Sequence, residues 1–213
     1  MHILITGATR GIGAGLSAHY RAAGHRVTGT GRSAAADMSL DVAQPPDFTA
    51  MADALEGQPI DLLVCNAGVY LDKGMALETD YAPDVWAQSF AVNVTGVFLT
   101  VQSLLPNLRA ADAPRIAIIS SQMASHIRAP GGSYVYRASK AAVLNLGRNL
   151  AADLAGQVAV GIYHPGWVQT DMGGDAAATT VEQSVAGLVS EFERLSHETT
   201  GCFRTFDGQD HPY

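Results

Sequence analysis

The chain has 213 residues, of which 47% are hydrophobic and 15% are charged, so it has ample material for a buried core and no compositional sign of disorder. Its formal net charge of -7 argues against a surface built to neutralise nucleic-acid phosphates or to bind an anionic membrane. We therefore expect a single domain spanning residues 1–213, with no nucleic-acid or membrane partner.

The cysteines and the first residues bear on redox state and location. Cys65 and Cys202 are too few for a disulfide framework and lack the paired spacing of a zinc site, so we expect reduced thiols and no bound metal. Residues 1–6 lead directly into a glycine turn, which leaves no room for a signal peptide, and no apolar run is expected to be long enough to cross a membrane. A cytoplasmic location is the expectation.

Buried strands and amphipathic helices alternate along the chain. Apolar, β-branched runs predict strands at 3–5, 27–30, 60–65, 116–120, 158–163 and, more weakly, 202–206, with a short additional strand at 38–42. Helical spacing predicts helices at 12–23, 47–55, 84–108, 136–154 and 181–195. This alternation predicts an α/β fold in which a doubly wound parallel sheet has helices on both faces, and ligands of such sheets bind at the carboxyl ends of the strands.

A glycine-rich turn follows the first predicted strand and opens the first predicted helix. Glycines allow a tight turn and a close approach of backbone to a pyrophosphate, and the amides of a helix N-terminus attract the anion. We therefore predict a dinucleotide site formed by Gly7, Thr9, Arg10, Gly11, Ile12 and Gly13.

The end of the second strand indicates which dinucleotide is bound. Arg32 stands where an acidic residue usually binds the ribose hydroxyls, and Arg10 is placed to reach the same group. Because guanidinium groups suit a 2'-phosphate, the pair favours NADP(H), with NAD(H) possible and a solvated surface charge as the alternative for each arginine. Asp41 and Val42 follow the short third strand, where Asp41 either meets the adenine amino group or caps a turn.

Asn66, Ala67 and Gly68 close the fourth predicted strand with an amide and two small residues. Small side chains at a strand end permit a flat ligand to approach. Asn66 either ties neighbouring strands together or contacts a ribose.

Tyr136 and Lys140 begin a long predicted helix. Their spacing of four puts both side chains on one face, where the ammonium lowers the pKa of the phenol toward the range useful for proton transfer. Tyr134 is the competing tyrosine, but it would point elsewhere on a continuous helix and is interpreted as substrate-facing or structural.

Two polar residues complete the predicted catalytic group. Ser121 ends a buried strand, where a substrate carbonyl oxygen needs a hydrogen-bond donor. Asn93 lies among apolar neighbours on the preceding helix, where its amide either holds a water that extends a proton path from Lys140 or bonds to backbone.

These separated motifs, in this order and over nearly the whole chain, resemble the short-chain dehydrogenase/reductase family, in its small C-factor-like and carbonyl-reductase-like branch. The resemblance implies a Rossmann-like domain in which Tyr136 is the proton donor or acceptor, Lys140 binds the nicotinamide ribose and Asn93 supports the relay. It also implies that Ser121 positions the substrate oxygen. By the same resemblance, the nicotinamide lies along Pro165, Gly166, Val168 and Thr170.

One spacing departs from the family pattern. The interval from Ser121 to Tyr136 is two residues longer than usual, and the usual interval counted back from Tyr136 reaches Met123, which has no hydroxyl. An insertion within 124–133 is the simplest explanation, and Ser120 and Ser125 are the alternatives to Ser121.

The expected activity is the NADP(H)-dependent interconversion of a carbonyl and an alcohol on a small-molecule substrate, with direct hydride transfer between nicotinamide and substrate carbon. Two other functions stay open: a dinucleotide-binding regulatory or signalling module with little turnover, and an epimerase or dehydratase that uses the same tyrosine and lysine. The resemblance further implies a homodimer or homotetramer that pairs through the helices predicted at 84–108 and 136–154.

Overall fold

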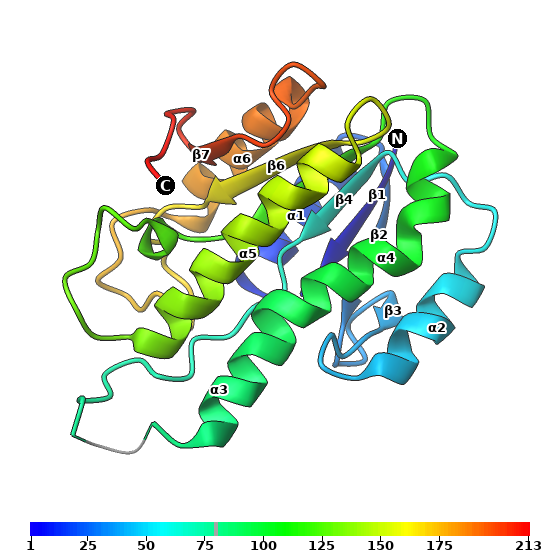
Figure 1. Ribbon diagram of the computed structural model, residues 1–213. Helices are drawn as coiled ribbons and strands as arrows, with labels where there is room; N and C mark the ends of the chain where they lie inside the picture. The colour runs from blue at the N-terminus through cyan, green and yellow to red at the C-terminus, as the bar shows by residue number, and fades with distance from the viewer. Residues whose placement is uncertain (79–80) are drawn as a thin grey trace.

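The computed structural model describes residues 1–78 and 81–213, and these residues form one parallel sheet with the strand order β3-β2-β1-β4-β5-β6-β7 (Figure 1). The strands are β1 (His2–Thr6), β2 (Arg26–Gly31), β3 (Met38–Ser39), β4 (Leu62–Cys65), β5 (Arg115–Ile119), β6 (Ala159–His164) and β7 (Phe203–Thr205). The strand order reverses between β1 and β4, where doubly wound sheets bind their ligands. The predicted α/β, Rossmann-like fold is confirmed.

Helices cover both faces of the sheet. They are α1 (Gly11–Ala22), α2 (Pro45–Ala54), α3 (Pro83–Phe90), α4 (Gly96–Arg109), α5 (Tyr134–Asp153) and α6 (Val181–Arg194). In Figure 1, α2, α4 and α5 lie on the face toward the viewer, while α1 and α6 lie behind the sheet. Their placement follows from the right-handed crossovers that join neighbouring parallel strands.

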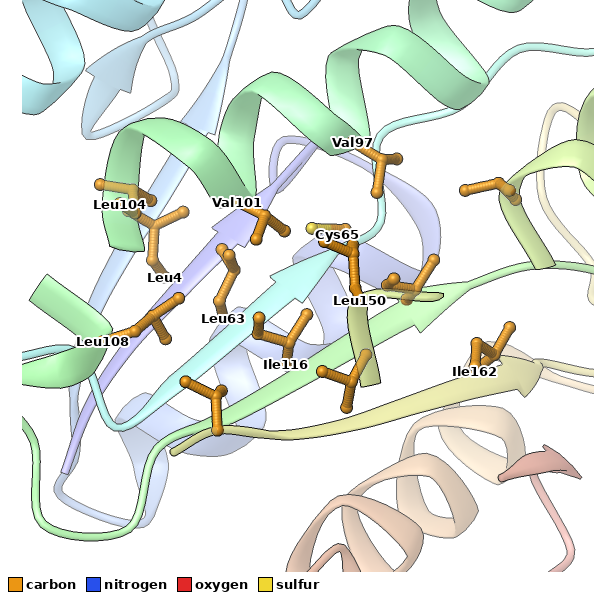
Figure 2. Close-up of a cluster of buried hydrophobic side chains, with 14 of the residues drawn as sticks. Leu4, Leu63, Cys65, Val97, Val101, Leu104, Leu108, Ile116, Leu150 and Ile162 are labelled. Carbon is orange, nitrogen blue, oxygen red and sulfur yellow. The ribbon is translucent and has the colours of Figure 1, made fainter. Parts of the chain in front are cut away.

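The central strands are buried on both faces, which explains their continuous apolar runs. In β4, Leu63 and Cys65 face the cluster under α2, α4 and α5 (Figure 2). Leu62 and Val64 face the cluster under α1 and α6 on the other side of the sheet. Complete burial raises the pKa of the Cys65 thiol to about 12, so this cysteine is a core residue and not a reactive thiol.

Truncation of Leu63 is expected to destabilise the fold strongly. Its side chain is 0% exposed in the middle of the sheet, so Leu63→Ala leaves a cavity and should lower the free energy of unfolding by about 2–5 kcal/mol. Urea denaturation followed by circular dichroism measures the change. Leu77→Ala is the matched control, because Leu77 is 67% exposed and its truncation should change stability by less than about 0.5 kcal/mol. Equal effects of the two substitutions would contradict this account of the core.

Two predicted elements differ in the structure. The predicted strand at 38–42 is confined to Met38–Ser39, because the Asp41 carboxylate accepts a hydrogen bond from the Ala43 amide at 3.0 Å and so begins a turn. The predicted helix at 84–108 is interrupted by a π-helical turn, η1 (Ala91–Thr95), between α3 and α4. Such turns insert one extra residue into a helix and are frequent at functional sites.

The helical stretch Pro83–Arg109 corrects one further expectation. It has 27 residues, and an 18-residue window within it has a mean hydropathy of 1.3, so by length and composition alone it could cross a membrane, contrary to the expectation from the sequence. In the fold, however, Val101, Leu104 and Leu108 of α4 pack against the sheet (Figure 2). The same length and hydropathy are found in core helices, and this stretch occupies the position of one.

Candidate active site

The glycine turn lies at the point where the strand order reverses. Gly7 and Gly11 adopt positive φ values of 66° and 52°, which side chains disfavour. A Cβ on Gly13 would lie 2.2 Å from the Gly7 carbonyl oxygen, so only glycine lets α1 pack this closely on the turn. Thr9 and Ile12 lie in the same segment, and a Cβ on Gly31 would meet the Thr9 methyl at 2.9 Å. The arrangement fits a pyrophosphate at the start of α1.

Asn66 braces this turn from the end of β4. Its Nδ2 donates to the carbonyl oxygens of Thr6 at 3.0 Å and Gly7 at 3.1 Å. The Thr6 hydroxyl in turn accepts from the amides of Asn66 and Ala67. Of the two predicted roles for Asn66, the structure shows the tie between neighbouring strands, which leaves the small Ala67 and Gly68 beside the glycine turn.

The two arginines that are predicted to bind one phosphate follow β1 and β2, which are neighbouring strands of the sheet. Arg32 is exposed directly after β2. Arg10 instead pairs with Asp171, Nη1 to Oδ2 at 2.8 Å, with both side chains more than 70% exposed. Such exposed ion pairs contribute about 0–1 kcal/mol to the stability of the folded protein. Asp37, which the sequence analysis did not consider, accepts from the Gly29 amide within β2 and pairs with Arg21, so its charge is already engaged.

The residues after β3 lie beside the edge of the sheet that β3 forms. Asp41 makes the turn described above, which is the second of its predicted roles, and its own amide donates to the Asp47 carboxylate at 2.8 Å. Val42 is buried, and a Cβ on Gly96 of α4 would lie 2.6 Å from the Val42 carbonyl oxygen. The close packing of α4 fixes this segment next to the sheet edge.

Tyr136 and Lys140 lie together on the first turns of α5, as their spacing predicts. Both are buried, and the Lys140 Nζ lies 5.7 Å from the centre of the Tyr136 ring. The same Nζ donates to the Ile119 carbonyl oxygen at the end of β5 at 3.0 Å. The helix therefore delivers a phenol and an ammonium to the carboxyl end of the sheet.

The three candidate serines have different surroundings. Ser120 donates to the Lys140 carbonyl oxygen, and Ser125 donates to the carbonyl oxygen of Tyr213. Ser121 and Tyr136 line the same cavity, and the Ser121 hydroxyl accepts a hydrogen bond from the Met123 amide at 3.1 Å. Ser121 also caps a short 3₁₀ turn, η2 (Gln122–Ala124), which begins the segment where an insertion was inferred.

Asn93 lies in the π-helical turn and is fully engaged. Its Oδ1 accepts from the Val69 amide at 2.8 Å, and its Nδ2 donates to the Val69 carbonyl oxygen and to the Ser139 hydroxyl. Its amide thus bonds to backbone, one of its two predicted roles. A Cβ on Gly68 would lie 3.3 Å from the Asn93 Oδ1 and 3.5 Å from the Lys140 Nζ, so glycine leaves space between the two groups.

Burial controls the protonation of the central groups. It raises the pKa of Tyr136 to about 12, with contributions in the same direction from Tyr70 and Asp72, while the Ser121 hydrogen bond lowers it. Burial also lowers the pKa of Lys140 to about 8. The spacing of Tyr136 and Lys140 predicts a lowered tyrosine pKa, but the structure gives a raised one, because desolvation by burial is the largest contribution.

A cavity of about 610 Å³ opens above these groups. Tyr70 and His164 contribute to its lining, and neither is predicted as a site residue from the sequence. The Tyr70 ring stacks on the Tyr136 ring at 4.2 Å. His164 is buried at the end of β6, and burial lowers its pKa to about 4, which keeps it neutral. No local pattern marks these residues, because their positions depend on contacts between distant segments.

The segment after β6 forms the opposite wall. Pro165, Gly166, Val168 and Thr170 all line the cavity, as the resemblance implies. A Cβ on Gly11 would lie 3.2 Å from the Thr170 methyl, so this wall adjoins the glycine turn. Lys73 reaches across the mouth and donates to the Met172 carbonyl oxygen at 2.9 Å.

A doubly wound sheet with a glycine turn, a buried tyrosine and lysine and an adjoining cavity defines a dinucleotide-binding oxidoreductase. A family model described as short chain dehydrogenase matches residues 1–180. The C-signal of Myxococcus xanthus is 37% identical over 158 residues, which cover 73% of this chain and 93% of the relative. The 1-hydroxy-2-glutathionyl-2-methyl-3-butene dehydrogenase of a Rhodococcus species is 31% identical, and the match covers 97% of this chain and 96% of the relative.

Solved structures agree with these relatives. The NADPH-bound carbonyl reductase from chicken fatty liver superposes with a TM-score of 0.90 at 27% identity, covering 100% of this chain and 98% of that one. The carbonyl reductase Sniffer of D. melanogaster gives a TM-score of 0.91 at 25% identity, with 100% and 99% coverage. The chain belongs to the short chain dehydrogenase family, and it is an NAD(P)-dependent oxidoreductase that acts on CH–OH or C=O groups.

Proposed function

We propose that the protein is an NADP(H)-dependent carbonyl reductase in which Tyr136 is the general acid or base. The observation that carries the proposal is that Ser121 and Tyr136 line one cavity, which also includes Ile12 of the glycine turn. Ser121 holds the substrate oxygen, and Tyr136 supplies the proton to that oxygen. Lys140 binds the nicotinamide ribose, and Asn93 supports the relay by holding the loop at Val69.

The dinucleotide, when bound, supplies the hydride to the carbonyl carbon. The residues present fit it: the turn at Gly7 to Gly13 receives the pyrophosphate, and the segment from Pro165 to Thr170 borders the nicotinamide. Burial keeps the Tyr136 phenol protonated at neutral pH, which is the form that a general acid needs. The lining contributed by Tyr70, Met123 and Trp167 suits a substrate with an apolar or aromatic body.

The proposal is tested by following NADPH absorbance with a panel of ketones, aldehydes and quinones. Consumption of NADPH with formation of the alcohol supports the reductase. The name of the C-signal relative favours a second candidate, a dinucleotide-binding signalling module, and tight NADPH binding without turnover of any compound would favour that function. Product formation without net change in NADPH would indicate an epimerase or dehydratase, and failure to bind either dinucleotide would refute all three.

Arg32 is expected to determine the preference for NADPH. Loss of one charge-assisted contact to a 2'-phosphate costs about 1.5–3 kcal/mol, so Arg32→Ala should lower kcat/KM for NADPH by about 10- to 100-fold and leave the value for NADH nearly unchanged. Steady-state kinetics with both cofactors measure this. Arg26→Ala is the matched control, since Arg26 is exposed at the opposite end of β2 and bonds to Gln58. A parallel loss with both cofactors would contradict phosphate recognition by Arg32.

Location and assembly belong to the same proposal. We propose a cytoplasmic enzyme that forms a homodimer or homotetramer through the outer faces of α3, α4 and α5. Trp86 and Phe98 support this pairing, because they are 37% and 40% exposed on the α3 to α4 stretch. Their large apolar surfaces would be covered by a second copy of the chain.

A further inference from the structure

Asp72 is a fully buried carboxylate that the proposed mechanism does not use. It lies in the loop after β4 and is 0% exposed. Its Oδ2 accepts from the Val135 amide at 2.8 Å, and its Oδ1 accepts from the Tyr136 amide at 3.2 Å. No ion pair involves it within residues 1–78 and 81–213. Burial of a charge is costly unless strong hydrogen bonds compensate, and here both bonds go to the first turn of α5.

The N-terminus of α5 depends on this distant carboxylate. The residue before the helix, Ser133, has a left-handed backbone with φ 49°, and its side chain accepts no hydrogen bond from the helix amides. Its hydroxyl is instead hydrogen bonded to the Tyr70 hydroxyl. A helix leaves its first amides unsatisfied, and an anion there is favoured by the helix dipole. Asp72 therefore replaces the missing local cap.

Tyr136 is held by the same short segment in two ways. Its backbone amide donates to Asp72, and its ring stacks on Tyr70 at 4.2 Å with an interplanar angle of 21°. The loop after β4 therefore contacts both the backbone and the ring of the residue that carries the phenol. A displacement of about 1 Å at a reacting group can cost about 100-fold in rate.

We propose that Asp72 is a positioning residue that fixes the first turn of α5. It thereby directs the Tyr136 phenol toward the substrate oxygen beside Ser121, and this inference rests on the proposed role of Tyr136. Asp72 acts through the two backbone amides of the helix. Asp72 takes no part in proton transfer. It contributes by fixing the position of the Tyr136 phenol, which transfers the proton.

The kinetic test compares Asp72→Ala, Asp72→Asn and Asp84→Asn. We expect Asp72→Ala to lower kcat by about 100-fold while KM for NADPH changes less than about 3-fold, because the glycine turn is untouched. Asp72→Asn keeps one acceptor oxygen, so its kcat should be about 10-fold higher than that of Asp72→Ala. Asp84→Asn is the matched control: Asp84 is an exposed acid in the first turn of α3, and its replacement should leave kcat unchanged.

Amide hydrogen exchange gives a readout that needs no turnover. In wild type the Val135 and Tyr136 amides should be protected, and in Asp72→Asn at least one of them should exchange about 10-fold faster or more. If wild type reduces no carbonyl, the proposed function fails, yet this exchange still decides whether Asp72 holds α5. If Asp72→Ala does not fold, Asp72→Asn alone decides. Unchanged exchange at both amides, or a kcat of Asp72→Asn equal to that of wild type in an active enzyme, would overturn the proposal.

Discussion

Replacement of Tyr136 by phenylalanine is expected to lower kcat for carbonyl reduction by about 10²- to 10⁴-fold, the usual contribution of a positioned general acid. The side chain is only 7% exposed and stacks on Tyr70, so phenylalanine preserves the packing and removes only the hydroxyl from the cavity lining. The affinity for NADPH should change less than about 3-fold, because the ring does not form the glycine turn. Steady-state NADPH oxidation and fluorescence titration measure the two quantities.

Tyr134→Phe is the control for this substitution. Tyr134 lies two residues earlier on α5, is 38% exposed and packs edge-on against Tyr81, outside the lining of the cavity. Its loss of a hydroxyl should leave kcat within about 2-fold of wild type. Comparable losses in the two variants would mean that a general effect on the helix, and not proton transfer by Tyr136, explains the result.

Substitution of Gly13 by alanine is expected to weaken NADPH binding by about 100-fold and to lower the melting temperature. The added Cβ would lie 2.2 Å from the Gly7 carbonyl oxygen and 2.6 Å from the Asn66 Nδ2. Neither atom can yield without opening the turn or shifting α1, and overpacking of this kind costs about 1–3 kcal/mol. Fluorescence titration with NADPH and a thermal melt in the absence of cofactor measure the two effects separately.

Gly15→Ala tests whether the effect is specific to the turn. Gly15 lies on the same helix two residues later, and its added Cβ would meet only methyl groups of Val181 and Val185. Side-chain methyls can move where a backbone carbonyl cannot, so NADPH affinity should fall by less than about 5-fold. An equally large loss of affinity in Gly15→Ala would show that any added volume on α1 disrupts the site.

The sequence predicts those parts of the molecule that depend on local spacing. The period of the apolar residues predicts the strands and helices, and the interval of four predicts that Tyr136 and Lys140 share a face. The position of Ser121 at the end of a strand predicts that it reaches the site, and in the structure it lines the same cavity as Tyr136. These inferences need no knowledge of contacts between distant segments.

The remaining features depend on contacts that no local pattern encodes. Asp72 meets α5 across more than sixty residues of chain, and the partner of Arg10 is Asp171, from the far end of the sequence. The pKa of Tyr136 moves opposite to the expectation because the degree of burial cannot be read from a spacing of four residues. The π-helical turn at Asn93 likewise follows from its bonds to Val69, on another segment.

The parallel strand order has a consequence for how the working enzyme comes into existence. β1 and β4 are neighbours in this sheet although α1, β2, β3 and α2 separate them in the sequence, and Ile3 to Ile5 of β1 pair with Leu62 to Val64 of β4. The proposed site draws on the ends of β1, β4, β5 and β6 together. Long-range pairings of this kind form late in folding, since loop closure must precede the contacts that reward it. Pro165 follows β6, so a chain in which β6 has not paired with β5 lacks one side of the proposed site.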